Sequence, residues 1–165
     1  MTQTPTVTQV EDKMRRMWLL SLIVALSLGT TSCKWLKLKL GIGYVVENPE
    51  PGTPEAVMQK VLKALSIKDE NRSWQAFLKL LHSKEKQPGY ISSWKRMKFP
   101  PLRRKVHYYI LDPSKYSYKL KAKRPGLEGT IKLYLYNPNT DVPTPCKFKR
   151  DPKAGGAWRV YSSCL

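Results

Sequence analysis

The segment KYSYKLKAKRPGLEGTIKLYLY, residues 115–136, contains two predicted strands and the turn that joins them. In 115–122 and in 130–136, apolar or aromatic residues occupy every second position. This period of two is typical of a strand with one buried face. The residues expected on that face are Tyr116, Tyr118, Leu120, Ile131, Leu133 and Leu135. The opposite face is therefore predicted to be basic and aromatic.

Three further segments in the C-terminal half are predicted strands. They are residues 105–111, 146–150 and 157–163, which as a group are rich in Tyr, Val, Ile and Leu. Turn-forming pairs such as Asp-Pro, Asn-Pro and Gly-Gly lie between the predicted strands. Because the connections are short, neighbouring strands are expected to pair antiparallel.

The preceding part of the chain has helical periodicity. Thr53-Pro54-Glu55 has the order of a helix start: a capping threonine, a proline at the first position and an acid in the first turn. Val57, Val61 and Leu65 follow at helical spacing. Residues 66–73 are expected to break this helix.

Two more helices are predicted after that break. One carries its apolar face on Trp74, Phe77, Leu78 and Leu81. A short third helix is expected at 90–99, ended by the consecutive prolines at 100 and 101. Helices followed by an antiparallel meander predict an α+β fold, with two to three N-terminal helices packed on a curved sheet of about five strands.

This order of elements resembles the nuclear-transport-factor-like superfamily over residues 53–165. The resemblance implies a cone-shaped fold, in which N-terminal helices pack inside a strongly curved sheet. A cystatin-like arrangement, with one helix on a sheet, is the alternative.

A short apolar run near the N-terminus predicts export. Arg15 and Arg16 precede the run 18–28, which is followed by small residues. As a helix the run extends ~18 Å, whereas a bilayer span needs roughly 20 apolar residues. A positively charged start, a short apolar run and small residues are typical of a secretory signal peptide. Because residues 1–13 are polar and acidic, we also expect translation to start at Met14.

The sequence LSLGTTSC, residues 26–33, resembles the lipobox of bacterial lipoproteins. The resemblance implies that Cys33 is lipidated and becomes the new N-terminus, and that Lys34 after it directs the protein to the outer membrane, facing the periplasm. A plain signal-peptidase cut near 30–32 is the alternative. The predicted organisation is a signal peptide (1–32), a lipidated cysteine with a tether (33–52) and one α+β domain (53–165).

Two cysteines remain after the export signal. Cys146 and Cys164 flank a predicted hairpin, and an even number of cysteines in an exported protein is expected to be oxidised. We predict a disulfide between them, with two buried free thiols as the alternative. Two cysteines and two distant histidines do not have zinc-site spacing, so no metal is expected.

No set of residues with catalytic spacing is evident in the sequence, and no cofactor is predicted. His82 is expected to cap a helix or lie on the surface, and His107 to be hydrogen-bonded in a strand. His107 with Asp112 is the one candidate pair for a cavity enzyme of the cone-shaped type. The protein is therefore predicted not to be an enzyme.

Charge is the strongest functional signal. The chain has a net charge of +18, from 30 Lys and Arg against 12 Asp and Glu. Three of these cations and two of these acids precede Cys33, so the predicted mature chain still carries +17. Self-repulsion at this charge disfavours the folded state, which favours an anionic partner.

Basic residues cluster around aromatic ones in 92–105 and 115–124, and a further basic run lies at 147–153. The candidate anion-binding residues are Lys95, Arg96, Lys98, Arg103, Arg104, Lys105, Lys119, Lys121 and Arg124. Such clusters suit anionic lipid, acidic polysaccharide or an acidic protein, and they also suit nucleic acid. We predict a membrane-anchored, non-enzymatic lipoprotein of the cell envelope that binds an anionic surface, ligand or partner. A cytoplasmic nucleic-acid-binding protein is the alternative.

Overall fold

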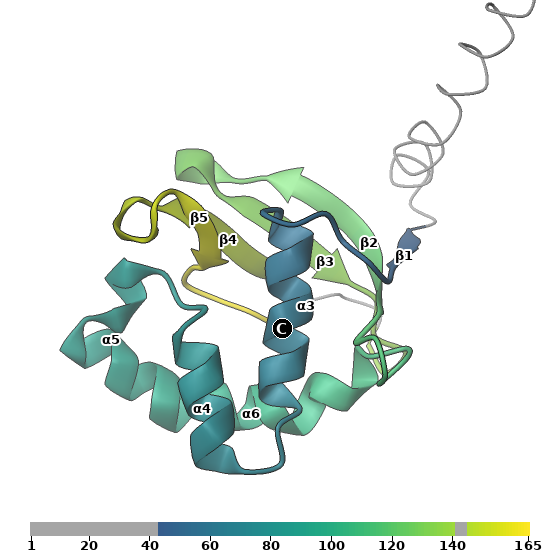
Figure 1. The fold of residues 1–165 in the computed structure, drawn as a ribbon, viewed down its shortest axis with the longest axis horizontal. Helices are drawn as coiled ribbons and strands as arrows, with labels where there is room; N and C mark the ends of the chain where they lie inside the picture. Colours follow the sequence, from purple (N-terminus) through teal and green to yellow (C-terminus); the bar gives the residue numbers. More distant parts are fainter. Residues whose placement is uncertain (1–42, 141–144) are drawn as a thin grey trace, which may run out of the picture.

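The computed structural model describes residues 43–140 and 145–165 (Figure 1). The helices are α3 (Pro54–Leu65), α4 (Glu70–Leu78), α5 (Pro88–Ser93) and α6 (Phe99–Lys105). The strands are β1 (Tyr44–Val46), β2 (Tyr118–Pro125), β3 (Ile131–Leu135), β4 (Pro145–Asp151) and β5 (Ala157–Val160). They form one antiparallel sheet in the order β1-β2-β3-β4-β5. The predicted α+β class, with helices on a five-stranded antiparallel sheet, is confirmed. The predicted signal peptide, the start at Met14, Cys33 and tether residues 34–42 lie outside the described residues.

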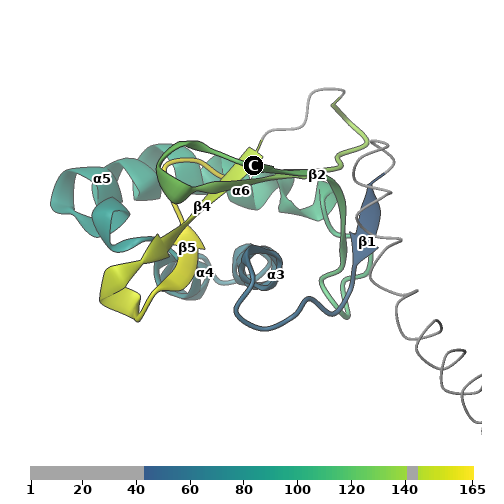
Figure 2. The same ribbon diagram turned by 90° about the horizontal axis from the view of Figure 1, so that it is seen from above.

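Helix α3 begins where the sequence predicts. The Oγ1 atom of Thr53 accepts a hydrogen bond from the backbone N–H of Ala56 at 3.3 Å, and Pro54 occupies the first turn. The helix lies across one face of the sheet (Figures 1 and 2). The sheet side chains buried on that face are Tyr118, Leu120, Leu133, Leu135, Cys146, Phe148 and Val160. The alternation in 115–136 therefore predicts the buried face of β3 and of the first part of β2 correctly, and after Leu120 a register shift reverses the faces of β2.

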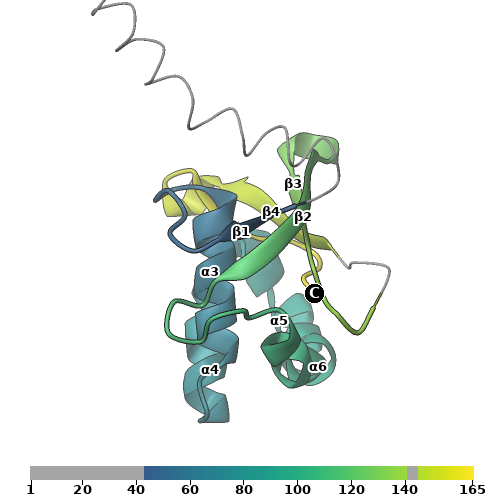
Figure 3. The same ribbon diagram turned by 90° about the vertical axis from the view of Figure 1, so that its right-hand side faces the viewer.

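A second part of the core is aromatic and lies between α4 and the helical segment from α5 to α6. The ring centroid of Phe77 is 5.6 Å from those of Trp94 and Phe99, and Trp74 meets Phe99 edge-on at 5.1 Å. The indole N–H of buried Trp94 donates to Glu85 Oε2 at 2.7 Å. Helices α5 and α6 lie beneath the strands in the views of Figures 1 and 3.

The segment after α4 lies against the edge strand β5. The N–H of Val160 donates to Leu80 O, and the N–H of His82 donates to Val160 O, both at 2.9 Å. This parallel bridge covers an edge that would otherwise expose unpaired backbone groups. Asp151 reinforces it by accepting hydrogen bonds from Ser83 N at 2.9 Å and Ser83 Oγ at 2.8 Å. Burial raises the pKa of Asp151, but the hydrogen bonds from Ser83 outweigh this and hold the pKa below its ordinary value.

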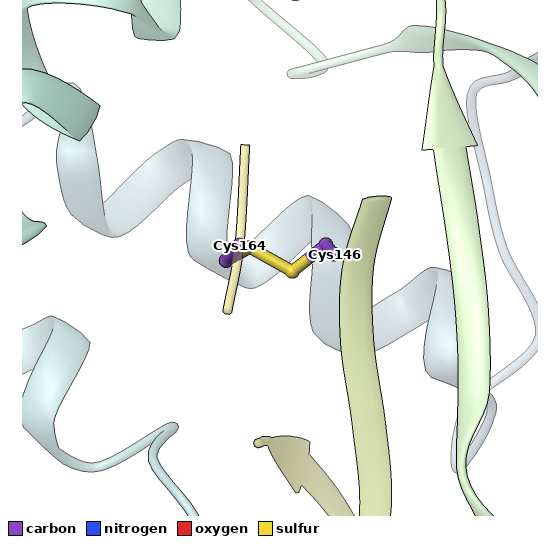
Figure 4. The surroundings of a disulfide bond; sticks show 2 residues. All are labelled: Cys146 and Cys164. Atoms are coloured by element: carbon purple, nitrogen blue, oxygen red, sulfur yellow. A yellow bond between two sulfur atoms is a disulfide. The ribbon is translucent and has the colours of Figure 1, made fainter. Parts of the chain in front are cut away.

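The disulfide between Cys146 and Cys164 is present, as the sequence predicts (Figure 4). It ties the C-terminal segment to β4. Two backbone hydrogen bonds run beside it, from Lys147 N to Ser163 O at 2.9 Å and from Tyr161 N to Lys147 O at 2.8 Å. Residues 161–164 therefore continue along β4 after β5 ends.

The predicted strand at 105–111 is wrong. Residue 105 ends α6, and residues 106–108 form a 3₁₀ turn. The buried side chains here are Leu102, Val106 and Tyr109, which recur at helical spacing across the predicted boundary. The prolines at 100 and 101 do not end the helix, because they occupy the first turn of α6, where a backbone N–H has no partner to lose.

Other boundaries also differ from the predictions. Residues 70–73 are not a break but the first turn of α4, since Asp69 Oδ1 caps it by accepting from Arg72 N at 2.7 Å. Tyr116 has a φ of 51°, so it lies in a turn and β2 starts later than expected. Strand β5 ends at Val160, three residues before the predicted strand end.

Strand β1 lies within the segment expected to be a tether. Tyr44 pairs with Leu120, and Val46 pairs with Tyr118. Gly43 precedes it with a φ of +68°, and a Cβ atom there would lie 2.5 Å from Leu120 O. Only glycine fits this close approach, so the folded unit begins before residue 53.

Candidate anion-binding face

The sheet surface opposite α3, here called the outer face, carries the basic and aromatic side chains of four strands. Its position follows from the strand register, because residues next to a buried one point to the other side. On β2 a register shift between Leu120 and Ala122 turns Arg124 to the same face as Lys119. The cations on the outer face are Lys119, Lys121, Arg124, Lys132, Lys147, Lys149 and Arg159, and its tyrosines are Tyr134, Tyr136 and Tyr161.

The register aligns these cations across the strands. Arg124 on β2 is opposite Lys132 on β3, which is opposite Lys147 on β4. Lys149 and Arg159 form a second opposite pair, between β4 and β5. Neighbouring strands lie about 4.8 Å apart, and like charges directly opposite each other destabilise a sheet. The outer face thus concentrates positive charge at a cost in folding free energy.

Little of this charge is neutralised within the described part of the chain. Lys149 Nζ lies 2.8 Å from Glu128 Oε2, an ion pair that raises the pKa of Lys149. No ion pair among the described residues involves Arg124, Lys132 or Lys147. An added anion can therefore reduce the repulsion that the register creates.

The tyrosines of the outer face lie among the cations. The Nζ atoms of Lys119 and Lys121 are 5.2 Å and 5.9 Å from the ring centroid of Tyr136. The Arg124 guanidinium is 5.7 Å from the ring of Tyr134. These cation–π contacts hold charged groups close to the sheet, where a planar or extended ligand would contact charge and ring together.

A hollow of about 210 Å³ opens beside the row of cations. Its lining residues are Leu127, Glu128, Thr130, Lys132, Lys147, Tyr161 and Ser162. Lys98 reaches the same region from the helical segment, since its Nζ donates to Ser162 O at 2.9 Å. The hollow therefore combines opposed lysines with three hydroxyl side chains.

The structure separates the sequence-predicted anion-binding residues into four groups, one of which is Lys98 beside the hollow. Lys119, Lys121 and Arg124 lie on the outer face. Arg103 has a structural contact instead, because its guanidinium donates to Ile67 O at 2.9 Å and Lys68 O at 2.8 Å, which ties α6 to the turn before α4. The residues Lys95, Arg96, Arg104 and Lys105 are exposed on the helical segment. Within the described ranges, no hydrogen bond, ion pair or ring contact joins these four to the outer face.

Several outer-face residues are absent from the sequence-predicted set: Lys132, Lys147, Lys149, Arg159, Tyr134, Tyr136 and Tyr161. The alternation in 130–136 already places Lys132 and Tyr134 on the non-buried face. What the sequence does not show is that four strands bring their cations into register, because pairing is decided by contacts between distant segments.

His107 and Asp112, the candidate pair for a cavity enzyme, each have other contacts. His107 is exposed in the 3₁₀ turn, and its ring lies tilted against that of Tyr108 with centroids 3.9 Å apart, so the prediction that it lies in a strand is wrong. Asp112 accepts from Ser114 N at 2.8 Å and Ser114 Oγ at 2.7 Å, and these bonds lower its pKa. No hydrogen bond or ion pair joins His107 to Asp112 in the described ranges.

His82 is buried and caps a short helical turn. Its Nδ1 accepts from Lys84 N at 3.1 Å, and its Nε2 lies 3.3 Å from Arg150 O. In this arrangement Nδ1 is the acceptor and Nε2 faces a backbone carbonyl. The turn that it caps is the 3₁₀ helix Ser83–Lys86, which follows it, rather than helix α4.

A larger hollow, of about 500 Å³, lies at the edge of the sheet between β1 and the start of α3. Glu55 and Lys123 line it and are joined by an ion pair of 2.7 Å. Burial and the Glu55 carboxylate raise the pKa of Tyr44 beside them. The second carboxylate oxygen of Glu55 is buried without a hydrogen-bond partner.

Within 43–140 and 145–165, no group of three or more His, Cys, Asp or Glu side chains could hold a metal ion. No described helix is long and apolar enough to cross a membrane.

No protein-family model, no curated protein and no solved structure matches the chain.

Proposed function

We propose that the protein is an exported lipoprotein of the bacterial cell envelope, without enzymatic activity, whose domain binds an anionic partner through the outer face of its sheet. The observation that carries the binding proposal is the alignment of Arg124, Lys132 and Lys147 across three strands without an ion-pair partner in the described part. An anion bound on this row would reduce the repulsion between the cations and so stabilise the folded protein.

Two features of the sequence support the proposed membrane anchor. The apolar run 18–28 and the lipobox-like residues before Cys33 lie shortly before β1. A lipid on Cys33 would hold the domain near a surface that carries anionic groups. At such a surface each Lys or Arg contributes about 1 kcal/mol to binding.

The anchor is tested by the intact mass of the protein from its native membrane fraction. We expect a chain that starts at Cys33 and carries added acyl mass, and we expect that mass to disappear in the Cys33→Ser variant. A full-length, unmodified chain in the soluble fraction would contradict export. It would favour the alternative of a cytoplasmic nucleic-acid-binding protein.

The binding face is tested by neutralising cations outside the hollow. The variant carries Lys119→Gln, Lys121→Gln and Arg124→Gln in the full chain, held in nanodiscs of neutral phosphatidylcholine. We expect its affinity for a soluble polyanion, heparin, to fall by at least about tenfold at low salt, and the salt dependence to become shallower.

A matched control removes the same charge elsewhere. Lys60 and Lys63 on α3 and Lys79 after α4 are exposed, and their triple glutamine variant should keep most of the heparin affinity. If the control loses as much affinity as the outer-face variant, binding reflects net charge alone and the proposed face is wrong.

A further inference from the structure

The hollow beside the cation row has the composition of a binding site for one anionic group. Lys132 and Lys147 line it from opposite positions on β3 and β4, and both side chains are half-buried. The side chains of Thr130, Tyr161 and Ser162 complete the lining with hydroxyl groups. The Thr130 hydroxyl already donates to Leu127 O at 2.8 Å, so the donors left to line this space of about 210 Å³ are the two lysines and the hydroxyls of Tyr161 and Ser162.

We propose that this hollow binds a phosphate group, an inference that rests on the proposed function of the outer face. A phosphate monoester carries about −1.5 to −2 charges at pH 7 and three strong acceptor oxygens. It can therefore neutralise both opposed lysines and still accept a hydroxyl hydrogen bond. A carboxylate carries one charge and two oxygens, so it leaves one lysine uncompensated.

The surroundings of the hollow add positive charge. Lys98 lies at its rim through its bond to Ser162 O, and Arg124 is the partner of Lys132 on the other side. Lys149 Nζ is 5.1 Å from the ring of Tyr161. A phosphate in the hollow would thus lie among several cations, which extends its attraction beyond the two direct contacts.

Glu128 is the acidic residue of the lining. It has a φ of 56° and is followed by Gly129 with a φ of 71°, so two successive left-handed residues shape the turn that brings its carboxylate to the hollow. Its side chain is 69% exposed and pairs with Lys149. We infer that this carboxylate competes with a bound phosphate, so its removal should strengthen binding.

The test uses the full chain in phosphatidylcholine nanodiscs titrated with inorganic phosphate by calorimetry. We expect the Lys132→Gln/Lys147→Gln variant to lose at least tenfold in phosphate affinity and Glu128→Gln to gain severalfold. The matched control, Lys60→Gln/Lys63→Gln, should bind as the wild type does. Thermal unfolding of each variant verifies that the fold is retained. Unchanged phosphate affinity in the Lys132→Gln/Lys147→Gln variant would overturn the proposal.

Further titrations identify the source and specificity of the phosphate. If phosphatidic acid in the nanodisc abolishes binding of inorganic phosphate, the site takes a lipid headgroup; if phosphate still binds, the site takes a soluble phosphate. Equal competition by sulfate or acetate would overturn the assignment to phosphate. A wild-type protein that binds heparin but not phosphate would refute the phosphate site alone, whereas a wild-type protein that binds neither would refute the proposed function of the outer face.

Discussion

Replacing Phe77 with alanine should lower the free energy of unfolding by about 3–5 kcal/mol, the usual range for deleting a buried phenylalanine. Phe77 is fully buried, and its ring lies 5.6 Å from both Trp94 and Phe99 and 6.3 Å from Trp74. Its removal leaves a cavity that rigid aromatic neighbours cannot fill. Urea unfolding of the wild type and the variant measures the difference.

The control for Phe77→Ala is Leu127→Ala. Leu127 is a large apolar residue but is 88% exposed, so its truncation should change stability by less than about 0.5 kcal/mol. If Phe77→Ala costs no more than Leu127→Ala, the aromatic cluster does not join α4 to the helical segment as described.

Removing the disulfide should lower the free energy of unfolding by roughly 3 kcal/mol. The bond joins residues separated by 18 positions, and closing a loop of this size restricts the unfolded chain by about that amount in the chain-entropy model. The variant is Cys146→Ala/Cys164→Ala, because alanine leaves no buried thiol. Chemical unfolding of the oxidised wild type and the variant provides the comparison.

Two controls separate the disulfide from other effects. Wild-type protein unfolded in the presence of a reducing agent should lose stability similar to the double variant. Cys33→Ala should keep the full stability, because it leaves the Cys146–Cys164 bond intact. No change on reduction would contradict the expected contribution of the bond.

The disulfide also bears on the candidate site. It fixes the segment that follows β5, and this segment supplies Tyr161 and Ser162 to the hollow. Because the disulfide attaches this segment to β4, those two residues are held beside Lys147, which lies on β4. Stability and the shape of the proposed site therefore depend on the same bond.

Apolar pairs on the buried face of the sheet offset the repulsion between cations on the outer face. Leu133 and Cys146 are opposite each other and fully buried, and the next pair along β3 and β4 is Lys132 with Lys147. The apolar pairs stabilise one face, while the cation pairs destabilise the other. Core packing thus permits the charge that the proposed function uses.

Features that depend on neighbouring residues could be predicted from the sequence. The period of two in 115–136 predicted the buried face of β3 and of β2 up to Leu120, and Thr53-Pro54-Glu55 marked the start of α3. The two cysteines flanking a hairpin predicted the disulfide. The first two signals operate within one element or one turn, where the local backbone geometry decides which side chains share a face, and the cysteine pair spans a single hairpin.

Other features of the fold arise from contacts between distant segments. Residues 99–108 are helical because Leu102, Val106 and Tyr109 pack into the core, although the composition after residue 105 favours a strand. Tyr44–Val46 becomes an edge strand because β2 offers it a partner. The cation row exists because the register places Arg124, Lys132 and Lys147 opposite one another, and a slip of one residue would turn them to the other face. The register of paired strands depends on contacts between distant segments, so it cannot be read from any one segment of the sequence.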